Sequence, residues 1–306
     1  MKISILGAGA MGCLFGARLS AHNDIDLVNG SISSVEGINA GGVTVSDREG
    51  NTYHANIRSR LSGSSCEPCD LLIVFVKNYA TEKALSENRN LIGENTVLLS
   101  LQNGMGHERI AESFLPKERI LIGITNDNSI SEGPGKVIHS GKGPMSIGSL
   151  IGNRKLAEKM IAVFTESGFD CSYSDSVRHL MWSKLLVNLT ANATTAILGC
   201  RSGYIAESAN LNAVCKALMD EAIAVAKADG EEFDEVTMLE HLTKMSAAYS
   251  QGRTSMCQDI SKNRKTEIDF INGAVARLGR QYGIPTPTND AIINLVHAKE
   301  YIQGIV

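Results

Sequence analysis

The sequence predicts a two-domain α/β protein, in which a doubly wound, mostly parallel sheet is followed by an all-α domain. A glycine-rich turn follows the first apolar run, further apolar runs recur through the first half, and helical periodicity replaces them in the second half. The length of 306 residues also fits about two domains. We expect residues 1–174 to form the first domain and residues 175–306 the second.

The N-terminal segment has the order strand, glycine turn, helix, strand. Ile3–Leu6 is a short apolar run, a helical stretch covers Cys13–Ala21, and Ile25–Val28 is a second apolar run. Between the first run and the helix lies a Gly-x-Gly-x-x-Gly motif, made of Gly7, Ala8, Gly9, Ala10, Met11 and Gly12. Within about 30 residues this order is typical of the dinucleotide-binding unit of a Rossmann-type sheet, where the motif binds the pyrophosphate. The alternative is a strand–helix turn that binds no ligand.

The end of the second predicted strand bears on the choice of dinucleotide. NAD-binding sheets usually have an acidic residue there, and NADP-binding sheets an arginine. This chain has Asn29 instead, and Asp26 lies inside the strand. We expect Asn29, with Ser31 and Ser33, to hydrogen-bond the 2′-phosphate of NADP(H). The missing arginine leaves NADH open.

Three further apolar runs predict strands that are buried on both faces of the sheet: Leu71–Val76, Val97–Leu101 and Ile120–Thr125. The first ends at Lys77 and the second at Asn103, within the segment Gln-Asn-Gly-Met-Gly. Ligands of open α/β sheets bind beyond the carboxyl ends of the strands, so Lys77 and Asn103 are candidate site residues. The alternatives are a surface lysine and an ordinary Asn-Gly turn.

The rest of the first domain is expected to be mixed. Gly133–Gly148 predicts two short strands that add antiparallel pieces to the sheet, Asn153–Gly168 predicts a helix, and Phe169–Tyr173 a last strand. After Asp175, a plausible N-cap, only helices are predicted, at residues 175–198, 207–229, 235–251, 259–282 and 288–302.

One face of the first helix of the second half carries Lys184, Asn188 and Asn192 at i, i+4 and i+8. Leucine and valine surround them, and polar groups buried in apolar surroundings need partners. The stripe therefore predicts either a functional face or a solvated one. Farther along, Glu267 lies in a mixed-charge helical segment that also fits structural salt bridges, and Ser255 is either a helix cap or a ligand contact.

Composition and charge indicate which partners and compartments are expected. Lys and Arg number 29 against 33 Asp and Glu, and this balance of −4 does not favour nucleic acid or an anionic membrane. Seven scattered cysteines are typical of a cytoplasmic chain with reduced thiols. No apolar run reaches 18 residues, and the N-terminal apolar stretch runs into the glycine turn, so we expect neither a membrane span nor a signal peptide.

Taken together, these segments resemble the ketopantoate reductase family, whose members have a C-terminal domain like that of 6-phosphogluconate dehydrogenase. The resemblance covers essentially the whole chain, and its motifs occur in order at comparable spacing. They are Gly7–Gly12, Val76–Lys77, Gln102–Gly106, Gly133–His139, Trp182–Asn188, Ser255–Asp259 and Lys265–Gly273.

The resemblance implies NADPH-dependent reduction of 2-dehydropantoate (ketopantoate) to (R)-pantoate, a step of pantothenate and coenzyme A biosynthesis. It implies that Lys184 is the general acid, with Glu267 as its catalytic neighbour. The implied substrate contacts are Asn103, Asn188, Asn192 and Ser255, and the implied cofactor contacts include Lys77, Asn103 and Ser129. No metal is implied, and a homodimer is compatible with the family.

Two positions depart from the family pattern. Many relatives have an arginine near position 29, and some have an asparagine where this chain has Ser202. Two alternative functions follow: a reductase of another 2-oxo acid on the same scaffold, and a non-catalytic NADP(H)-binding regulatory protein. The presence of Lys184, Asn188, Asn192 and Glu267 favours an enzyme over the latter.

Overall fold

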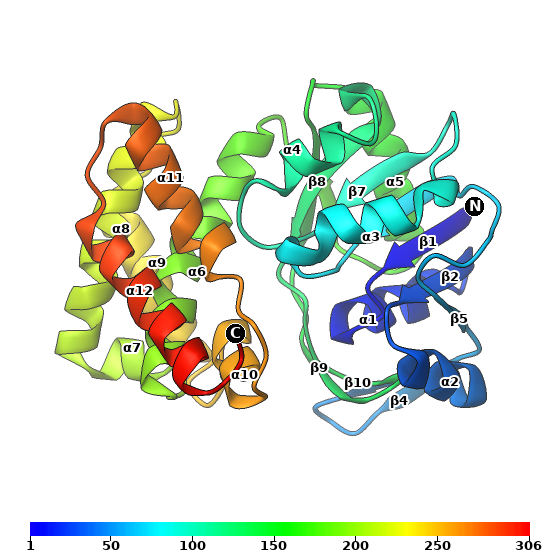
Figure 1. Cartoon of the computed structure of the whole chain (residues 1–306), viewed down its shortest axis with the longest axis horizontal. Coiled ribbons are helices and arrows are strands. Elements are labelled where there is room, and N and C mark those ends of the chain that lie inside the picture. Colours follow the sequence, from blue (N-terminus) through cyan, green and yellow to red (C-terminus); the bar gives the residue numbers. More distant parts are fainter. The chain divides into compact units, whose positions relative to one another are not determined.

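The computed structural model describes residues 1–306 (Figure 1). An eight-stranded sheet organises its first half. The strand order is β12-β11-β8-β7-β6-β1-β2-β5. All pairs are parallel except β8 with β11. The strands are β1 (Lys2–Leu6), β2 (Asp24–Asn29), β5 (Arg58–Leu61), β6 (Leu71–Val74), β7 (Val97–Ser100), β8 (Ile120–Thr125), β11 (Met145–Ser149) and β12 (Cys171–Tyr173). The predicted fold class, a doubly wound sheet followed by helices, is confirmed.

A second, four-stranded sheet was not predicted. Its order is β4-β3-β10-β9, made of β4 (Thr52–Ala55), β3 (Val43–Asp47), β10 (Lys136–Gly141) and β9 (Asn128–Gly133). The two strands expected within residues 133–148 are therefore divided between the sheets. β11 adds the expected antiparallel strand to the large sheet, whereas β10 pairs in parallel with β3.

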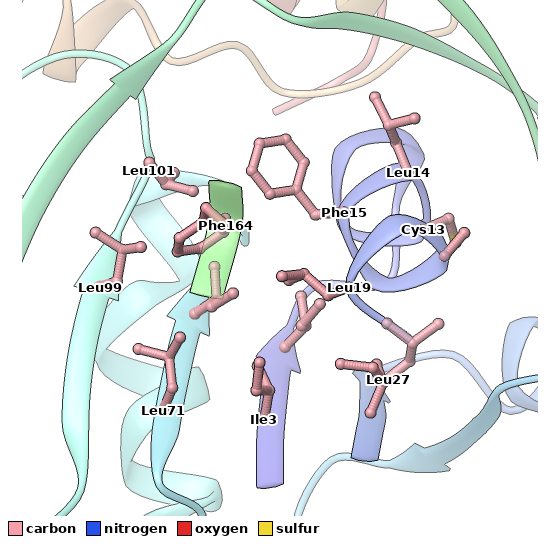
Figure 2. Packing of buried hydrophobic residues seen from close by; sticks show 14 of the residues in the cluster. Ile3, Cys13, Leu14, Phe15, Leu19, Leu27, Leu71, Leu99, Leu101 and Phe164 are labelled. Atoms are coloured by element: carbon pink, nitrogen blue, oxygen red, sulfur yellow. The ribbon is translucent and has the colours of Figure 1, made fainter. Parts of the chain in front are cut away.

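Helix α1 (Ala10–Leu19) is buried on nearly every side, because it contacts β1 and β2 of the large sheet and β3, β9 and β10 of the small one. Such a helix is apolar all round rather than amphipathic. In Figure 2, Phe15 and Leu19 project from α1 towards the strands of the large sheet, and Leu14, which belongs to the same buried cluster, projects from another side of the helix. The ring of Phe15 packs edge-on against that of Phe164 at a centroid distance of 6.2 Å, so α5 lies on the same face as α1.

The other helices of the first half are α2 (Ile32–Gly41), α3 (Thr81–Glu87), α4 (His107–Glu112) and α5 (Arg154–Glu166), with 3-10 turns η1 (Asn78–Ala80), η2 (Arg89–Leu91) and η3 (Lys117–Arg119). The predicted helix at Asn153–Gly168 is confirmed as α5, and the Asn153 side chain caps it by accepting from Leu156 N. In Figure 1, α3 lies in front of the large sheet.

The second half is helical: α6 (Val177–Leu198), α7 (Tyr204–Glu207), α8 (Ala209–Ala228), α9 (Glu235–Ala248), α10 (Ser255–Ser261), η4 (Ile268–Phe270), α11 (Asn272–Tyr282) and α12 (Pro287–Ile302). The expectation of one helix over 259–282 is wrong. Thr254 caps a separate helix, α10, and Asn263 has a φ of +51°, which interrupts the helical backbone. The predicted cap Asp175 is also wrong, because Ser176 Oγ accepts from His179 N at 3.0 Å.

The chain forms two compact units. The first contains residues 1–102 and 107–180, and the second contains residues 103–106 and 181–306. A four-residue loop from the first half of the sequence therefore belongs to the helical unit. No helix is long and apolar enough to cross a bilayer.

Candidate active site

The turn between β1 and α1 depends on two glycines that no other residue could replace without strain. Gly7 has a φ of +103°, and a Cβ there would lie 2.7 Å from Val76 N. A Cβ on Gly12 would lie 2.0 Å from Gly7 O, so helix and turn approach each other as closely as backbone allows. A Cβ on Gly9, by contrast, would have no atom within 4 Å. The turn is therefore tight where it packs on itself and open at Gly9.

The N-terminus of α1 has the features of an anion site. Gly9 is the N-cap, no side chain caps the helix, and no acidic residue lies in its first turn. The first N–H groups of a helix have no intrahelical acceptor, and the helix dipole favours negative charge there. Beside this turn, Ser129 on β9 donates to Met11 Sδ at 3.1 Å. The residues present thus fit the pyrophosphate of a dinucleotide.

Asn29, at the end of β2, is next to the glycine turn. Its Nδ2 donates to Ala8 O at 3.4 Å, and its Oδ1 accepts from Ser31 N at 3.0 Å. The hydroxyls of Ser31 and Ser33 lie 3.0 Å apart and are exposed. Asp26 forms an ion pair with Arg60. The polar groups at the end of β2 are therefore amide and hydroxyl, with the nearby carboxylate already paired.

Gln102 joins the ends of two strands at the same sheet edge. Its Nε2 donates to Val76 O and to Thr81 Oγ1, both at 2.7 Å. Lys77, directly after Val76, is the N-cap of η1 and is partly exposed. Gln102 was not singled out from the sequence as a site residue, although it precedes Asn103. It holds in place the strand end from which Lys77 projects.

In the helical unit, the polar stripe of α6 lies along a largely apolar helix. Burial lowers the pKa of Lys184 to about 8, while the nearby Glu267 carboxylate acts to raise it. One turn further, Asn188 Nδ2 is buried and has no hydrogen-bond partner. A buried amide without a partner is rare and costs free energy, which makes it a candidate ligand donor.

The third member of the stripe reaches α10. Asn192, which is buried, donates through Nδ2 to Ser255 Oγ at 3.4 Å. One turn on, Thr195 Oγ1 lies 2.8 Å from Thr254 Oγ1. Sequence reasoning singled out neither Thr195 nor its contact, although Thr195 follows Asn192 by three residues. These two contacts hold the exposed Ser255 beside the stripe.

Glu267 is 7% exposed and caps the turn η4 through its carbonyl, which accepts from Phe270 N at 3.0 Å. The loop 103–106 docks on the same turn, since Met105 N donates to Phe270 O at 2.9 Å. Gly104 has a φ of +81°, and a Cβ there would lie 2.2 Å from Phe270 O. Asn103 and Glu267 are thus held by one turn.

Trp182 and Ser202, which the comparison of sequence motifs also singled out, make hydrogen bonds within the helical unit. Trp182 is fully buried, and its Nε1 donates to Asp229 Oδ2 at 2.7 Å. Ser202 Oγ donates to Tyr249 O at 2.7 Å and to Gly252 O at 3.2 Å. Ser202 therefore holds the turn after α9 with its hydroxyl.

The predicted site residues fall into two groups. Gly7–Gly12, Asn29, Lys77 and Ser129 belong to the first compact unit, at the turn and strand ends where a dinucleotide would bind. The second group belongs to the helical unit and consists of Asn103, Lys184, Asn188, Asn192, Ser255 and Glu267. Such a glycine turn on a doubly wound sheet is typical of proteins that bind a dinucleotide, many of them oxidoreductases, and the helical unit adds a lysine whose pKa is lowered.

Comparison with known proteins identifies the family. Residues 3–152 match the family model of ketopantoate reductase PanE/ApbA, and residues 176–300 match the model of its C-terminal domain. The chain therefore belongs to the ketopantoate reductase family. It is 35% identical to the 2-dehydropantoate 2-reductase of Lactococcus lactis, covering 98% of both chains, and 32% identical to that of Pyrococcus horikoshii, covering 99% of both.

Solved structures show the same fold. D-Mandelate dehydrogenase, in complex with NADH and anilino(oxo)acetate, is 34% identical and superposes with a TM-score of 0.95, with 99% of this chain and 100% of that chain covered. The 2-dehydropantoate 2-reductase of Geobacter metallireducens is 26% identical, with a TM-score of 0.92 over 97% of this chain and 99% of that chain.

Proposed function

We propose that the chain reduces the 2-oxo group of 2-dehydropantoate to (R)-pantoate with NADPH. The observation that carries this proposal is the α6 stripe, where Lys184 has a pKa lowered to about 8 with Glu267 beside it. An ammonium close to its pKa at neutral pH is a suitable acid for a carbonyl oxygen. Family membership and the names of the curated relatives support 2-dehydropantoate as the substrate.

The roles of the residues follow from the charge that develops. Nicotinamide, when bound, supplies a hydride to the carbonyl carbon. Lys184 stabilises the negative charge that builds up on the carbonyl oxygen and donates its proton to that oxygen. Glu267 keeps the lysine protonated over a wider pH range, because its charge raises the pKa of the ammonium.

The amides and the hydroxyl would orient the substrate. The unpaired Nδ2 of Asn188 can donate to a carboxylate or hydroxyl oxygen of the substrate. Asn192 and Ser255, already joined by a hydrogen bond, offer further donors and acceptors. Asn103 is a candidate for contact with both substrate and cofactor. We therefore assign substrate binding to residues 175–306 and to the loop that carries Asn103.

The dinucleotide is assigned to residues 1–174. Gly7, Gly9 and Gly12, with the backbone of Ala8, Ala10 and Met11, would hold the pyrophosphate at the open N-terminus of α1. Asn29 and the neighbouring serine hydroxyls would receive the 2′-phosphate of NADPH, and Lys77 and Ser129 are further candidate contacts.

A second candidate function is reduction of a bulkier 2-oxo acid with NADH. The likeness to D-mandelate dehydrogenase in complex with NADH and anilino(oxo)acetate favours this candidate. The group at position 29 is an uncharged amide, which fits a ribose hydroxyl as well as a phosphate.

A substrate panel separates the candidates. We expect dinucleotide oxidation, followed at 340 nm with NADPH and with NADH, to be fastest by kcat/KM on 2-dehydropantoate among aliphatic and aromatic 2-oxo acids. A preference for benzoylformate with NADH would replace the first candidate by the second. Binding of a dinucleotide without turnover of any 2-oxo acid would favour a regulatory protein.

The variant Asn29→Asp tests the cofactor assignment. Its Oδ1 can still accept from Ser31 N, whereas the long hydrogen bond from Nδ2 to Ala8 O, at 3.4 Å, is lost. The new carboxylate repels a 2′-phosphate and can accept a hydrogen bond from a ribose hydroxyl. We therefore expect the ratio of kcat/KM with NADH to kcat/KM with NADPH to rise by at least about tenfold. Asn210→Asp, which adds the same charge to an exposed position of α8, is the control and should leave the ratio unchanged. An unchanged ratio in Asn29→Asp would remove Asn29 from the 2′-phosphate site.

A further inference from the structure

His297 on α12 lies between two carboxylates. Its Nε2 is 3.0 Å from Asp269 Oδ1, and its Nδ1 is 3.0 Å from Glu300 Oε2. An ionised carboxylate only accepts hydrogen bonds, so both ring nitrogens must carry a proton to make these two contacts. The geometry therefore points to an imidazolium ion at this position.

The charges around the ring agree with this protonation state. Burial acts to lower the pKa of His297, and the hydrogen bonds and charges of Glu300 and Asp269 outweigh it, so the pKa is raised. Of the other cations, Arg277 donates to the backbone carbonyl of Asp269, and Lys299 donates to the carbonyls of Ala196 and Ile197. Glu300 has a side chain that is only 1% exposed, and a carboxylate so buried needs a cationic partner.

These residues hold the turn that carries Glu267. The second oxygen of Glu300, Oε1, accepts from Thr266 N at 2.7 Å, directly before Glu267. Asp269, two residues after Glu267, is held by His297. The residues on both sides of Glu267 are thus held by hydrogen bonds, which we call its two anchors: Thr266 N to Glu300, and Asp269 to His297. Both Glu300 and Asp269 contact the imidazole ring of His297 on α12.

We propose that His297, with Glu300 and Asp269, forms a positioning group that fixes the Glu267 carboxylate relative to Lys184. This inference rests on the proposed function and deepens it. It assigns the positioning of Glu267 beside Lys184 to α12, a helix to which we assign no substrate or cofactor contact. Loss of the imidazolium charge would loosen both anchors and weaken the influence of Glu267 on the Lys184 ammonium.

The test uses the full chain with His297→Gln, which keeps N–H donors on one nitrogen but carries no charge. NMR titration of the lysine Cε and Nζ signals in the unliganded protein gives the pKa of Lys184 without reference to turnover. We expect this pKa to fall in His297→Gln, because Glu267 no longer raises it fully. His241→Gln, at an exposed histidine of α9, is the matched control and should leave it unchanged.

Kinetics provide the second measurement. We expect His297→Gln to lower kcat by about tenfold, the scale of coupling within one hydrogen-bond network, with KM for the dinucleotide unchanged. His297→Arg keeps a positive charge and several N–H donors. The His297 side chain is 39% exposed, so the longer arginine can be accommodated, and this variant should retain most of the activity. If His297→Gln does not fold, Asp269→Asn removes one anchor at a more exposed side chain and should lower the Lys184 pKa in the same direction.

The outcomes separate the inference from the function on which it rests. A folded His297→Gln protein with the wild-type Lys184 pKa and kcat overturns the positioning group. A lowered Lys184 pKa together with no turnover of any 2-oxo acid by the wild-type chain supports the positioning group and contradicts the proposed reaction instead.

Discussion

Lys184→Ala is expected to lower kcat for 2-oxo acid reduction by about 10²- to 10⁴-fold, the range that a general acid contributes. The variant lacks both the charge that stabilises the developing alkoxide and the proton that completes the alcohol. Its affinity for the dinucleotide should be unchanged, because the glycine turn belongs to the other compact unit. Stopped-flow turnover and calorimetric titration with NADPH and NADH measure the two properties separately.

The control for this variant is Lys244→Ala, which removes a lysine whose side chain is 77% exposed and pairs only with Glu240 on the same helix. It should retain wild-type kcat. A Lys184→Ala protein that turns over near the wild-type rate would show that another group supplies the proton.

The pH dependence of kcat gives the same lysine a signature. Only the protonated lysine can donate, so kcat for reduction should be level at neutral pH and fall as the pH rises through about 8. Alcohol oxidation needs the neutral amine and should rise over the same range. In Glu267→Gln the carboxylate that raises the Lys184 pKa is absent, so the alkaline limb should move to lower pH. If the fall of kcat at alkaline pH occurs at the same pH in Glu267→Gln as in the wild type, Glu267 does not influence the pKa of Lys184.

The second large effect is expected at Gly9. Gly9→Ala places a methyl group where no atom lies within 4 Å, at a φ of −83° that any residue adopts. The fold should therefore be kept, with an unchanged Tm. The methyl group would occupy the space needed by the pyrophosphate, so dinucleotide Kd should rise by at least about tenfold.

Gly12→Ala is the matched comparison, because it introduces the same methyl group three residues later. Its Cβ would lie 2.0 Å from Gly7 O, and neither backbone segment can move without breaking the turn. We expect Tm to fall by at least about 5 °C, as for a severe overpacking change. If Gly9→Ala binds the dinucleotide as tightly as the wild type, the pyrophosphate does not bind at this turn.

The sequence was informative where one local pattern determines the structure. The strands β1 and β8 appear as apolar runs because most of their residues are buried, and β2 and β8 contain the predicted runs almost unchanged. The α6 stripe was visible because residues four apart share a helix face. Both signals are local in the chain.

The unpredicted parts depend on contacts that are distant in sequence. The strand β3 alternates buried Val43 and Val45 with less buried residues, a pattern too short to be distinguished from a loop until β10 pairs with it. The break between α10 and α11 was missed because the turn at Glu267 is stabilised by Glu300, on another helix. The sequence equally gave no sign that the loop 103–106 belongs to the helical unit.

That loop has a consequence for biosynthesis of the chain. Met105 O accepts from Arg277, 172 residues further along the sequence, and Met105 N pairs with Phe270 O. At ribosomal rates of about 5–20 residues per second, roughly ten to thirty seconds pass between synthesis of the loop and synthesis of its partners. If the first unit folds during synthesis, it does so while the loop 103–106 still lacks its partners Phe270 and Arg277. Chimeras between relatives that join two halves at a single crossover would separate this loop from the turn it evolved with.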